Sequence, residues 1–361
     1  MDERRSVARA RRIVVKIGSR TLASDAGVYA RLAASVDGAR ANGKSVVLVS
    51  SGAIALGVKK LGFSGRPKEM ARLQAAAAAG QSVLMRAYDE AFGARGIPVA
   101  QVLLTHADLA DRARANNARL ALEALLEARA VPVLNENDSV AVDEIKFGDN
   151  DQLAAMVVPL VGADLLVLLS DVDGLLNETG SRIRIVRDVI TEALPHVTAA
   201  TSALGTGGMA SKLEAARRAT LAGANVVVAD ARRDEILDAV LDGEDVGTLF
   251  LAARERLSAK KHWIAFTLRP RGDLVLDRGA ADAVRTKGKS VLSVGVLGVR
   301  GDFRAGDAVR VLDPDGVELG RGLARCSASD AARVAGQTKR DLPTELGELA
   351  VVVHRDELAL T

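Results

Sequence analysis

Two apolar segments of this chain are joined by a dense run of acidic and amide side chains, Asn135-Glu136-Asn137-Asp138-Ser139-Val140-Ala141-Val142-Asp143-Glu144-Ile145-Lys146-Phe147-Gly148-Asp149-Asn150-Asp151. Residues 130–134 before it predict a buried strand, and residues 152–160 after it predict an apolar helix. Six carboxylates and three amides lie within seventeen residues, and like charges this close repel unless water, a cation or a charged ligand separates them. A solvated acidic loop is one interpretation. The position after a strand, where parallel α/β sheets bind ligands, favours a substrate loop.

Strand-like and helical segments alternate up to about residue 260. The expected strands are 12–19, 45–50, 99–104, 131–134, 165–169 and 225–229, and the expected helices are 28–41, 67–94, 109–128, 151–161 and 209–222. Regular alternation is typical of a mostly parallel sheet with helices on both faces. The sequence therefore predicts an α/β fold, a three-layer sandwich. Gly80, inside the second of these helices, marks a candidate kink.

The pattern changes near residue 260. Short β-like runs follow at 264–268, 273–276, 291–299, 308–312, 317–324 and 349–353. Between two of them, Asp313-Pro314-Asp315-Gly316 is a hairpin signal. Residues 270–361 carry fourteen Lys or Arg, fourteen Asp or Glu and one aromatic residue, Phe303. We therefore expect two domains, 1–262 and 270–361, of which the second is small and mostly β.

The composition limits the class of protein. A length of 361 residues suggests two domains, and 48% hydrophobic residues are enough to bury a sizeable core. Cys326 is the only cysteine, which excludes an internal disulfide and a cysteine-based zinc site. The sequence shows no secretory leader and no run of about twenty apolar residues, so we expect a cytoplasmic protein without a membrane partner. A net charge of +3 is too small to indicate nucleic acid binding.

The helix expected at 209–222 is preceded by a glycine-rich segment, Leu204-Gly205-Thr206-Gly207-Gly208-Met209-Ala210-Ser211-Lys212. Its glycines let backbone N–H groups converge on an anion, and the positive end of the helix dipole points to the same place. Lys212 falls in the first turn, where a cation is disfavoured unless an anion lies nearby. A flexible surface loop is the alternative. The P-loop spacing is absent, and the dinucleotide fingerprint Gly-x-Gly-x-x-Gly fails at Ala210.

Polar residues follow three of the expected strands. Lys16 lies in an otherwise apolar strand, so its ammonium either extends to the edge of the sheet or meets an anion at the end of the strand. Ser51 and Gly52 follow the second strand, and residues 170–174 follow another, where they contact a nucleotide or form only a turn. Two lysines, a glycine-rich anion site and acidic residues after a strand are what phosphoryl transfer needs. These segments contain no histidine, which suits a carboxylate acceptor that is already ionised, with a pKa of about 4.3.

Five short motifs follow one another along the chain: Val15-Lys16-Ile17-Gly18-Ser19, Ser50-Ser51-Gly52-Ala53-Ile54, Asn135-Glu136-Asn137-Asp138, Phe147-Gly148-Asp149-Asn150-Asp151, and Gly205-Thr206-Gly207-Gly208-Met209 with Lys212. Together they resemble the glutamate 5-kinases, a group within the amino acid kinase family. The resemblance spans essentially the whole chain, and the tail resembles the PUA domain of that group. It implies ATP-dependent phosphorylation of the γ-carboxylate of L-glutamate to L-glutamyl 5-phosphate, with Mg2+, as the first step of proline biosynthesis. It also implies feedback inhibition by proline and a homo-oligomer.

The resemblance assigns roles residue by residue. Lys16 and Lys212 would stabilise charge on the transferring phosphoryl group, and Asp151 would hold both lysines in place. Ser51, Asp138 and Asn150 would bind glutamate, with Asp138 next to the α-ammonium. ATP would be held by Lys16, Ser170, Asp171, Thr206, Gly207, Gly208, Met209, Ala210, Ser211 and Lys212. The metal ligands stay unidentified, and we expect phosphates and water to hold Mg2+. Ser50 and Ser170 stand where the family often has Thr, a mild departure that leaves a hydroxyl in place.

Two other functions stay open from the sequence. Another amino acid kinase, acting on N-acetylglutamate, carbamate or a nucleoside monophosphate, would share these motifs, although Asp138 and the appended β domain favour glutamate. An RNA-binding protein is the alternative of a different class, because PUA domains elsewhere bind RNA. RNA-binding modules usually carry basic surfaces and aromatic stacking positions. A tail with balanced charge and one aromatic residue makes RNA an unexpected partner.

Overall fold

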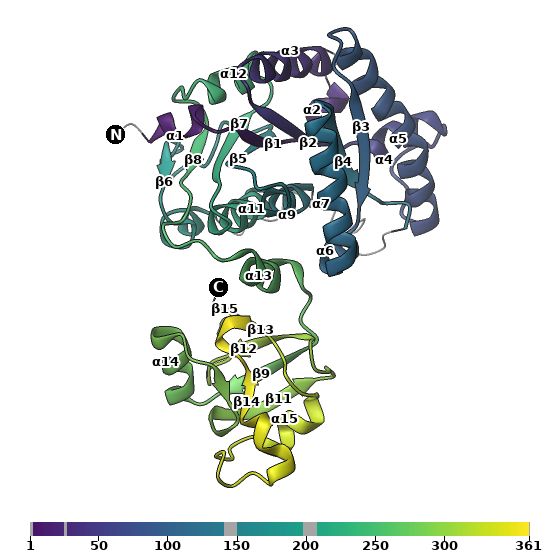
Figure 1. Ribbon diagram of the computed structural model, residues 1–361. Coiled ribbons are helices and arrows are strands. Elements are labelled where there is room, and N and C mark those ends of the chain that lie inside the picture. The colour runs from purple at the N-terminus through teal and green to yellow at the C-terminus, as the bar shows by residue number, and fades with distance from the viewer. Residues whose placement is uncertain (1–2, 25–26, 141–149, 198–207, 361) are drawn as a thin grey trace. The chain divides into compact units, whose positions relative to one another are not determined.

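The computed structural model describes residues 3–24, 27–140, 150–197 and 208–360, and the chain forms two compact units, Met1–Arg256 and Leu257–Thr361. In the first unit a single sheet lies between two layers of helices (Figure 1). The predicted three-layer α/β sandwich is therefore confirmed. In the described part of the chain, every helix is too short or too polar to span a bilayer.

The elements of the first unit follow the predicted alternation. Its strands are β1 (Arg12–Ile17), β2 (Ser45–Val49), β3 (Val99–Leu104), β4 (Val131–Glu136), β5 (Leu165–Ser170), β6 (Ile185–Val186), β7 (Asn225–Asp230) and β8 (Thr248–Phe250). Its helices are α1 (Arg4–Ala8), α2 (Ser19–Ser24), α3 (Val28–Ala41), α4 (Ala53–Lys60), α5 (Met70–Gly93), α6 (His106–Ala110), α7 (Arg112–Glu127), α9 (Asn150–Val161), α11 (Met209–Leu221) and α12 (Ile236–Leu241), with short turns η1 (Val189–Ala193) and η2 (Leu194–His196).

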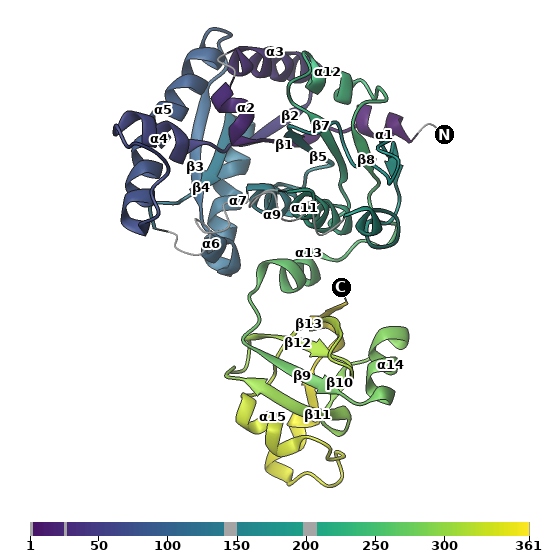
Figure 2. The same cartoon turned by 180° about the vertical axis from the view of Figure 1, so that it is seen from behind.

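The strands lie in the order β3-β4-β2-β1-β5-β7-β8-β6, and among the described pairs only β7 with β8 is antiparallel. Side chains alternate between the two faces of the sheet. On β1, Ile13, Val15 and Ile17 pack into the core under α3, α5 and α12, whereas Val14 packs into the core that contains α7, α9 and α11. Figure 2 shows the two helical layers from the opposite side. Burial on both faces explains why the central strands are apolar along almost their whole length.

Helices α4 and α5 cross with their backbones in contact. A Cβ atom at Gly57 would lie 1.7 Å from the carbonyl oxygen of Ala76, and one at Gly80 would lie 1.7 Å from the carbonyl oxygen of Ala53. Helix α5 runs from Met70 to Gly93 without a break, and the kink suggested at Gly80 stays a prediction. Glycine is needed there because any side chain would push α4 away. The crossing fixes the first residue of α4, Ala53, which lies beside the cavity described below.

The second unit is the smaller, strand-rich one. It contains β9 (Gly272–Leu276), β10 (Val291–Leu292), β11 (Val296–Gly301), β12 (Ala308–Leu312), β13 (Glu318–Leu323), β14 (Val351–Val353) and β15 (Leu358–Leu360), with helices and turns α13 (Ala259–His262), η3 (Trp263–Thr267), α14 (Arg278–Lys287), η4 (Ser293–Gly295), α15 (Ala328–Val334), η5 (Thr344–Ala350) and η6 (Arg355–Glu357). Five strands form one sheet, in the order β11-β9-β12-β13-β15, and β10 pairs with β14. The turn at residues 313–316 joins the antiparallel strands β12 and β13, as its sequence predicts. The expected strand at 264–268 is wrong, because residues 263–267 are helical.

Candidate active site

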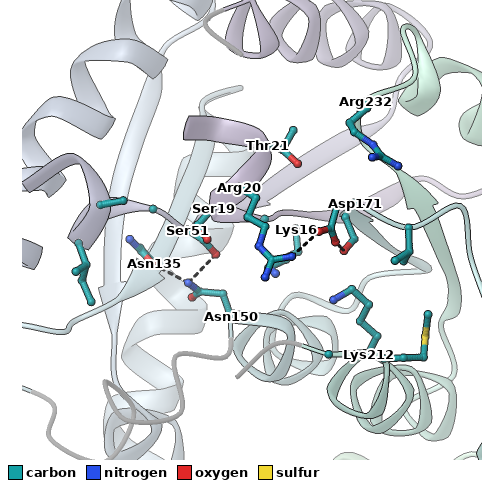
Figure 3. A pocket seen from close by; sticks show the side chains of 18 of the residues that line it. Lys16, Ser19, Arg20, Thr21, Ser51, Asn135, Asn150, Asp171, Lys212 and Arg232 are labelled. Carbon is teal, nitrogen blue, oxygen red and sulfur yellow. Dashed lines mark hydrogen bonds and ion pairs between the residues drawn. The ribbon is translucent and has the colours of Figure 1, made fainter. Parts of the chain in front are cut away.

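A cavity of about 720 Å3 opens at the edge of the sheet where the parallel strands have their carboxyl ends. Small-molecule sites commonly have volumes of about 300–1,000 Å3. The side chains around it come from segments far apart in the sequence (Figure 3). The lining includes Lys16, Gly18, Ser19, Arg20, Thr21, Ser51, Gly52, Arg66, Asn135, Glu136, Asp138, Asn150, Ser170, Asp171, His196, Gly208, Met209, Lys212 and Arg232.

Two lysines share one buried carboxylate at this cavity. Lys16 occupies the β1 position that points, like Val14, toward the layer containing α9 and α11. Asp151 lies in the first turn of α9, with its Oδ1 2.6 Å from Lys16 Nζ and its Oδ2 3.2 Å from Lys212 Nζ. The Asp151 side chain is 1% exposed, and both lysines are buried. The structure thus brings together the three residues that the sequence predicts to be catalytic.

Asp151 is held in its ionised form. Burial is the largest influence on its pKa and opposes ionisation. The charges of Lys16 and Lys212, with their hydrogen bonds, together outweigh burial and keep the pKa of Asp151 below its usual value. Two positive charges against one negative charge leave this group at +1. A rigid group of net positive charge is suited to stabilising an anion.

The N-termini of three helices add partial positive charge to the same cavity. The first residues of α4 and α11, Ala53 and Met209, and the first residue of α9, Asn150, all line it. Helix α4 follows Gly52, whose φ of 98° is a conformation that glycine adopts readily. Backbone N–H groups at a helix N-terminus have no partner within the helix and attract anions. The helix dipole disfavours the positive charge of Lys212 in the first turn of α11, and the negative charge of Asp151 offsets this effect.

Amide and hydroxyl side chains lie on another side of the cavity. Asn150 Nδ2 donates hydrogen bonds to Ser51 Oγ at 3.0 Å and to Asn135 Oδ1 at 3.1 Å. Figure 3 shows these bonds joining the turn after β2, the end of β4 and the start of α9. Asp138 lines the cavity from the segment after β4. All three predicted substrate residues, Ser51, Asp138 and Asn150, therefore contribute to one cavity.

The carboxyl end of β5 contributes the predicted nucleotide residues Ser170 and Asp171. Arg20 Nη1 donates to Asp171 Oδ2 at 2.7 Å, and Ser170 Oγ donates to Asp171 Oδ1 at 3.2 Å. The hydrogen bond from Arg20 is the main reason that the pKa of Asp171 lies below its usual value. The Arg20 side chain is 77% exposed, so this ion pair lies open to solvent.

The glycine-rich segment is described only from residue 208 onward. Thr206 and Gly207, two of the predicted ATP-binding residues, lie outside the described residues. Gly208, Met209 and Lys212 line the cavity. Ala210 and Ser211 lie in the first turn of α11 without forming part of the described lining, and the backbone oxygen of Ser211 accepts a hydrogen bond from Gln152 Nε2 at 3.0 Å.

Several lining residues carry no role in the sequence analysis. Arg20 follows the glycine turn after β1. A basic residue at such a turn is a sequence signal for anion binding, so Arg20 could have been found. Arg66 and His196 lie in segments without a recognisable pattern, so the sequence offers no means of finding them, whereas Arg232 follows the expected strand at 225–229, a position that is itself a usable signal. His196 is a histidine at the cavity, although the segments used for the prediction contain none. Asn135 belongs to a quoted motif but was given no function.

The described residues around the cavity include no complete set of metal ligands. Among the residues that the structure describes, no group of three or more His, Cys, Asp or Glu side chains is placed to hold a metal ion. Mg2+ commonly takes one or two carboxylates and completes its shell with water and substrate phosphates. The carboxylates at the cavity fit a cation that is bound mainly by the phosphates of a nucleotide.

Known proteins similar to this chain share both its parts. A model of the amino acid kinase family matches residues 11–230, and a model of the PUA domain matches residues 272–346. A protein named glutamate 5-kinase from Myxococcus xanthus is 46% identical and covers 99% of this chain and 98% of its own length. Proteins of the same name from Thermus thermophilus and Pelobacter propionicus are 46% and 43% identical, and each alignment covers 97% of both chains.

A solved structure shows the same fold. N-acetylglutamate synthase from Neisseria gonorrhoeae superposes with a TM-score of 0.51 at 16% sequence identity. The match covers 69% of this chain and 62% of that chain, which is less than two thirds of its length. At this identity the likeness concerns the fold alone.

Proposed function

The chain belongs to the amino acid kinase family, and from this we propose that it transfers the γ-phosphoryl group of ATP to the γ-carboxylate of L-glutamate, forming L-glutamyl 5-phosphate. The observation that carries the proposal is the group of Lys16, Asp151 and Lys212, held at one edge of a cavity of suitable size. Full-length relatives at 43–46% identity that are named glutamate 5-kinase support the same reaction. This reaction is the first step of proline biosynthesis.

The site offers what in-line phosphoryl transfer requires. An oxygen of the substrate γ-carboxylate attacks the γ-phosphorus, the bond from that phosphorus to the bridging oxygen breaks, and ADP leaves with the bond's electrons. Lys16 and Lys212 offset the charge on the phosphoryl oxygens, and Asp151 keeps their ammonium groups in position throughout. The attacking carboxylate is ionised near neutral pH, since a Glu-like group has a pKa of about 4.3. The step therefore needs no general base.

The two substrates would occupy different sides of the cavity. On the acceptor side, Ser51, Asp138 and Asn150 would bind glutamate, with the Asp138 carboxylate next to the α-ammonium. On the donor side, Ser170 and Asp171 would contact the nucleotide, together with Lys16 and the segment Thr206 to Lys212. Within that segment, Ala210 and Ser211 would act through backbone groups at the start of α11.

Mg2+ is the metal we propose for the reaction. The described side chains supply no complete set of metal ligands, so phosphate oxygens and water would provide most of them, with Asp171 and Asp173 as the carboxylates that line the cavity after β5. When bound, it would offset charge on the nucleotide phosphates. The protein's own contribution is the pair of lysines described above.

The regulatory and cellular properties of this enzyme are also proposals. Proline carries an ammonium and a carboxylate like glutamate, so we propose feedback inhibition by proline at the acceptor side. A homo-oligomer and a cytoplasmic location fit a biosynthetic enzyme of this family. The domain limits 1–262 and 270–361 likewise stay predictions.

The test is ADP release by the purified full chain with ATP, Mg2+ and L-glutamate. Hydroxylamine is added to trap the acyl phosphate as a hydroxamate, and N-acetylglutamate, carbamate and added proline are run in parallel. We expect hydroxamate from glutamate and none from N-acetylglutamate. Turnover with N-acetylglutamate and none with glutamate would replace the proposed acceptor while keeping the phosphotransferase.

A further inference from the structure

Behind the acceptor side of the cavity, three buried amide side chains form a continuous chain of hydrogen bonds. Gln81 of α5 accepts at Oε1 from Asn135 Nδ2 at 3.0 Å, and Asn135 Oδ1 accepts from Asn150 Nδ2 at 3.1 Å. Gln81 and Asn150 are each 8% exposed and Asn135 is 2% exposed. Asn135 and Asn150 line the cavity, whereas Gln81 lies behind them outside its lining. Figure 3 shows Asn135 and Asn150 side by side at the cavity.

The direction of this chain is set by a backbone group. The N–H of Glu136 donates to Asn135 at 2.9 Å. A backbone N–H is always a donor, so the Asn135 atom that it meets must be the carbonyl oxygen. The Asn135 NH2 group is then left to face Gln81, which must present its oxygen. By the same logic, Asn150 must turn its NH2 group toward Asn135.

The side-chain oxygen of Asn150 therefore stays available to accept a hydrogen bond. Its NH2 group donates to Asn135 Oδ1 and to Ser51 Oγ. Its Oδ1 is buried and has no hydrogen-bond partner among the residues that the structure describes. A buried acceptor without a donor is costly, by about 1–3 kcal/mol. An acceptor of this kind beside a ligand cavity favours a ligand that brings a hydrogen-bond donor.

L-Glutamate has one kind of strong donor. At neutral pH both carboxylates are ionised and only accept hydrogen bonds, so its α-ammonium is the single donor group. We infer that Gln81 is a positioning residue which, with the N–H of Glu136, fixes the direction of the amide chain so that Asn150 Oδ1 receives the α-ammonium. The inference rests on the proposed function and adds a reason why the site selects a free amino acid.

Gln81 is well placed to hold this direction. It follows Gly80, whose close contact with Ala53 fixes α5 against α4. Turning the Gln81 amide over would set its NH2 group against that of Asn135, two donors facing each other. Without the Gln81 oxygen, the Asn135 NH2 group loses its acceptor, and the orientation of Asn135 and Asn150 is less tightly held.

The test compares Gln81→Met, which removes the acceptor at similar length, with Gln81→Glu, which keeps an accepting oxygen whether or not it is protonated. Ser82→Ala is the matched control, because Ser82 is the next residue on α5, is exposed and bonds to Lys60. Each variant and the wild type are assayed with L-glutamate, with glutarate, which lacks the amino group, and with varied ATP. The wild type should prefer glutamate over glutarate.

For Gln81→Met we expect the kcat/KM preference for glutamate over glutarate to fall about tenfold, the effect of one buried hydrogen bond of about 1.4 kcal/mol. The KM for ATP should stay within about twofold of wild type, and Gln81→Glu and Ser82→Ala should keep the preference. A purely structural role for Gln81 would lower activity on both acceptors equally and leave their ratio unchanged.

Three results would overturn the inference while leaving the kinase in place. These are an unchanged preference in Gln81→Met, an equal loss of preference in Gln81→Glu, and a wild type that uses glutarate as well as glutamate. The last of these needs no variant, so it decides the question even if Gln81→Met does not fold. A wild type without turnover on glutamate would instead remove the proposed function and this inference with it.

Discussion

Replacing Asp151 by asparagine removes the charge at the centre of the site while keeping the size of the side chain. In the wild type, Lys16 Nζ and Lys212 Nζ lie 2.6 and 3.2 Å from the two oxygens of this carboxylate. After the substitution the two ammonium groups would stay near each other with a neutral amide between them. Each would lose a charged partner, and their mutual repulsion would no longer be offset.

The size of the effect follows from burial. The side chains of Asp151, Lys16 and Lys212 are 1%, 11% and 6% exposed, so water does little to screen these charges. Removing one partner of a buried ion pair typically costs about 3–5 kcal/mol. We expect Asp151→Asn to lower the free energy of unfolding of the first unit by that amount. For a unit of this size, it corresponds to a fall in Tm of about 6–20 °C.

The assay is thermal unfolding followed by circular dichroism, with Asp151→Asn, Lys212→Met and the double variant. Adding Lys212→Met to Asp151→Asn should raise the Tm again, because it removes a buried ammonium that no longer faces the Asp151 carboxylate. The pH dependence has a definite sign. Because the folded-state pKa of Asp151 is lowered, its stabilisation is complete above the unfolded-state pKa of about 3.9 and is lost as the pH falls through the folded-state pKa.

The gap in stability between wild type and Asp151→Asn should therefore be constant from about pH 5 to 7 and shrink below about pH 4. A Tm equal to that of wild type would refute the reasoning, since it would mean that the carboxylate gives no net stabilisation. A double variant that is less stable than Asp151→Asn would also contradict it, because Lys212 would then be stabilising without Asp151.

Three further predictions concern single side chains. Lys212→Met should lower kcat for glutamate-dependent ADP release about 10²–10³-fold, and a wild-type kcat would contradict its role at the phosphoryl group. Gly80→Ala should destabilise by about 1–3 kcal/mol in urea unfolding, whereas Gly38→Ala, in the last turn of α3 with open space around the new Cβ, should stabilise by about 0.5–1 kcal/mol. Arg20→Met should raise the KM for ATP about tenfold, but the same change at Arg114, an exposed arginine paired with an aspartate outside the cavity, should not.

The central strands could be predicted because both their faces are buried. An apolar run such as residues 165–169 has no solvated side, so its composition alone identifies it. The strands β6 and β8 are two and three residues long, which is too short for any periodic signal, and they were not predicted. Helix α14 is also absent from the prediction, although Asp277 caps its N-terminus and Gly288 follows its last residue, and both are sequence signals of a helix.

The error at residues 264–268 has a physical cause. Ile264, Ala265 and Phe266 are buried in a short helical segment, and a run of this length fits a buried strand equally well. Periodicity cannot separate the two, because residues 264–267 are all buried and neither a two-residue nor a 3.6-residue repeat appears. Only the packing of the second unit decides between them.

The charged residues of the site could be predicted from the sequence, whereas most of the contacts between its side chains could not. A lysine inside an apolar strand and another in the first turn of a helix are each more favourable beside an anion, and the sequence shows both features. The protein itself supplies part of this negative charge, because the Asp151 carboxylate contacts both ammonium groups. The hydrogen bond between Gln81 and Asn135 joins residues 54 positions apart, and no local pattern reports a contact of that kind.

The number of carboxylates in this group matters for the chemistry. With a second carboxylate the two lysines would be neutralised, and the site would offer a phosphoryl group no net attraction. With none, two buried ammonium groups would repel each other and either lose a proton or turn toward solvent. Among the residues that the structure describes, one carboxylate bonds to both lysines by different oxygens, which fixes both positions and leaves these three side chains with one positive charge. Catalysis by electrostatic preorganisation requires both properties, because charge that must first be positioned stabilises a transition state less.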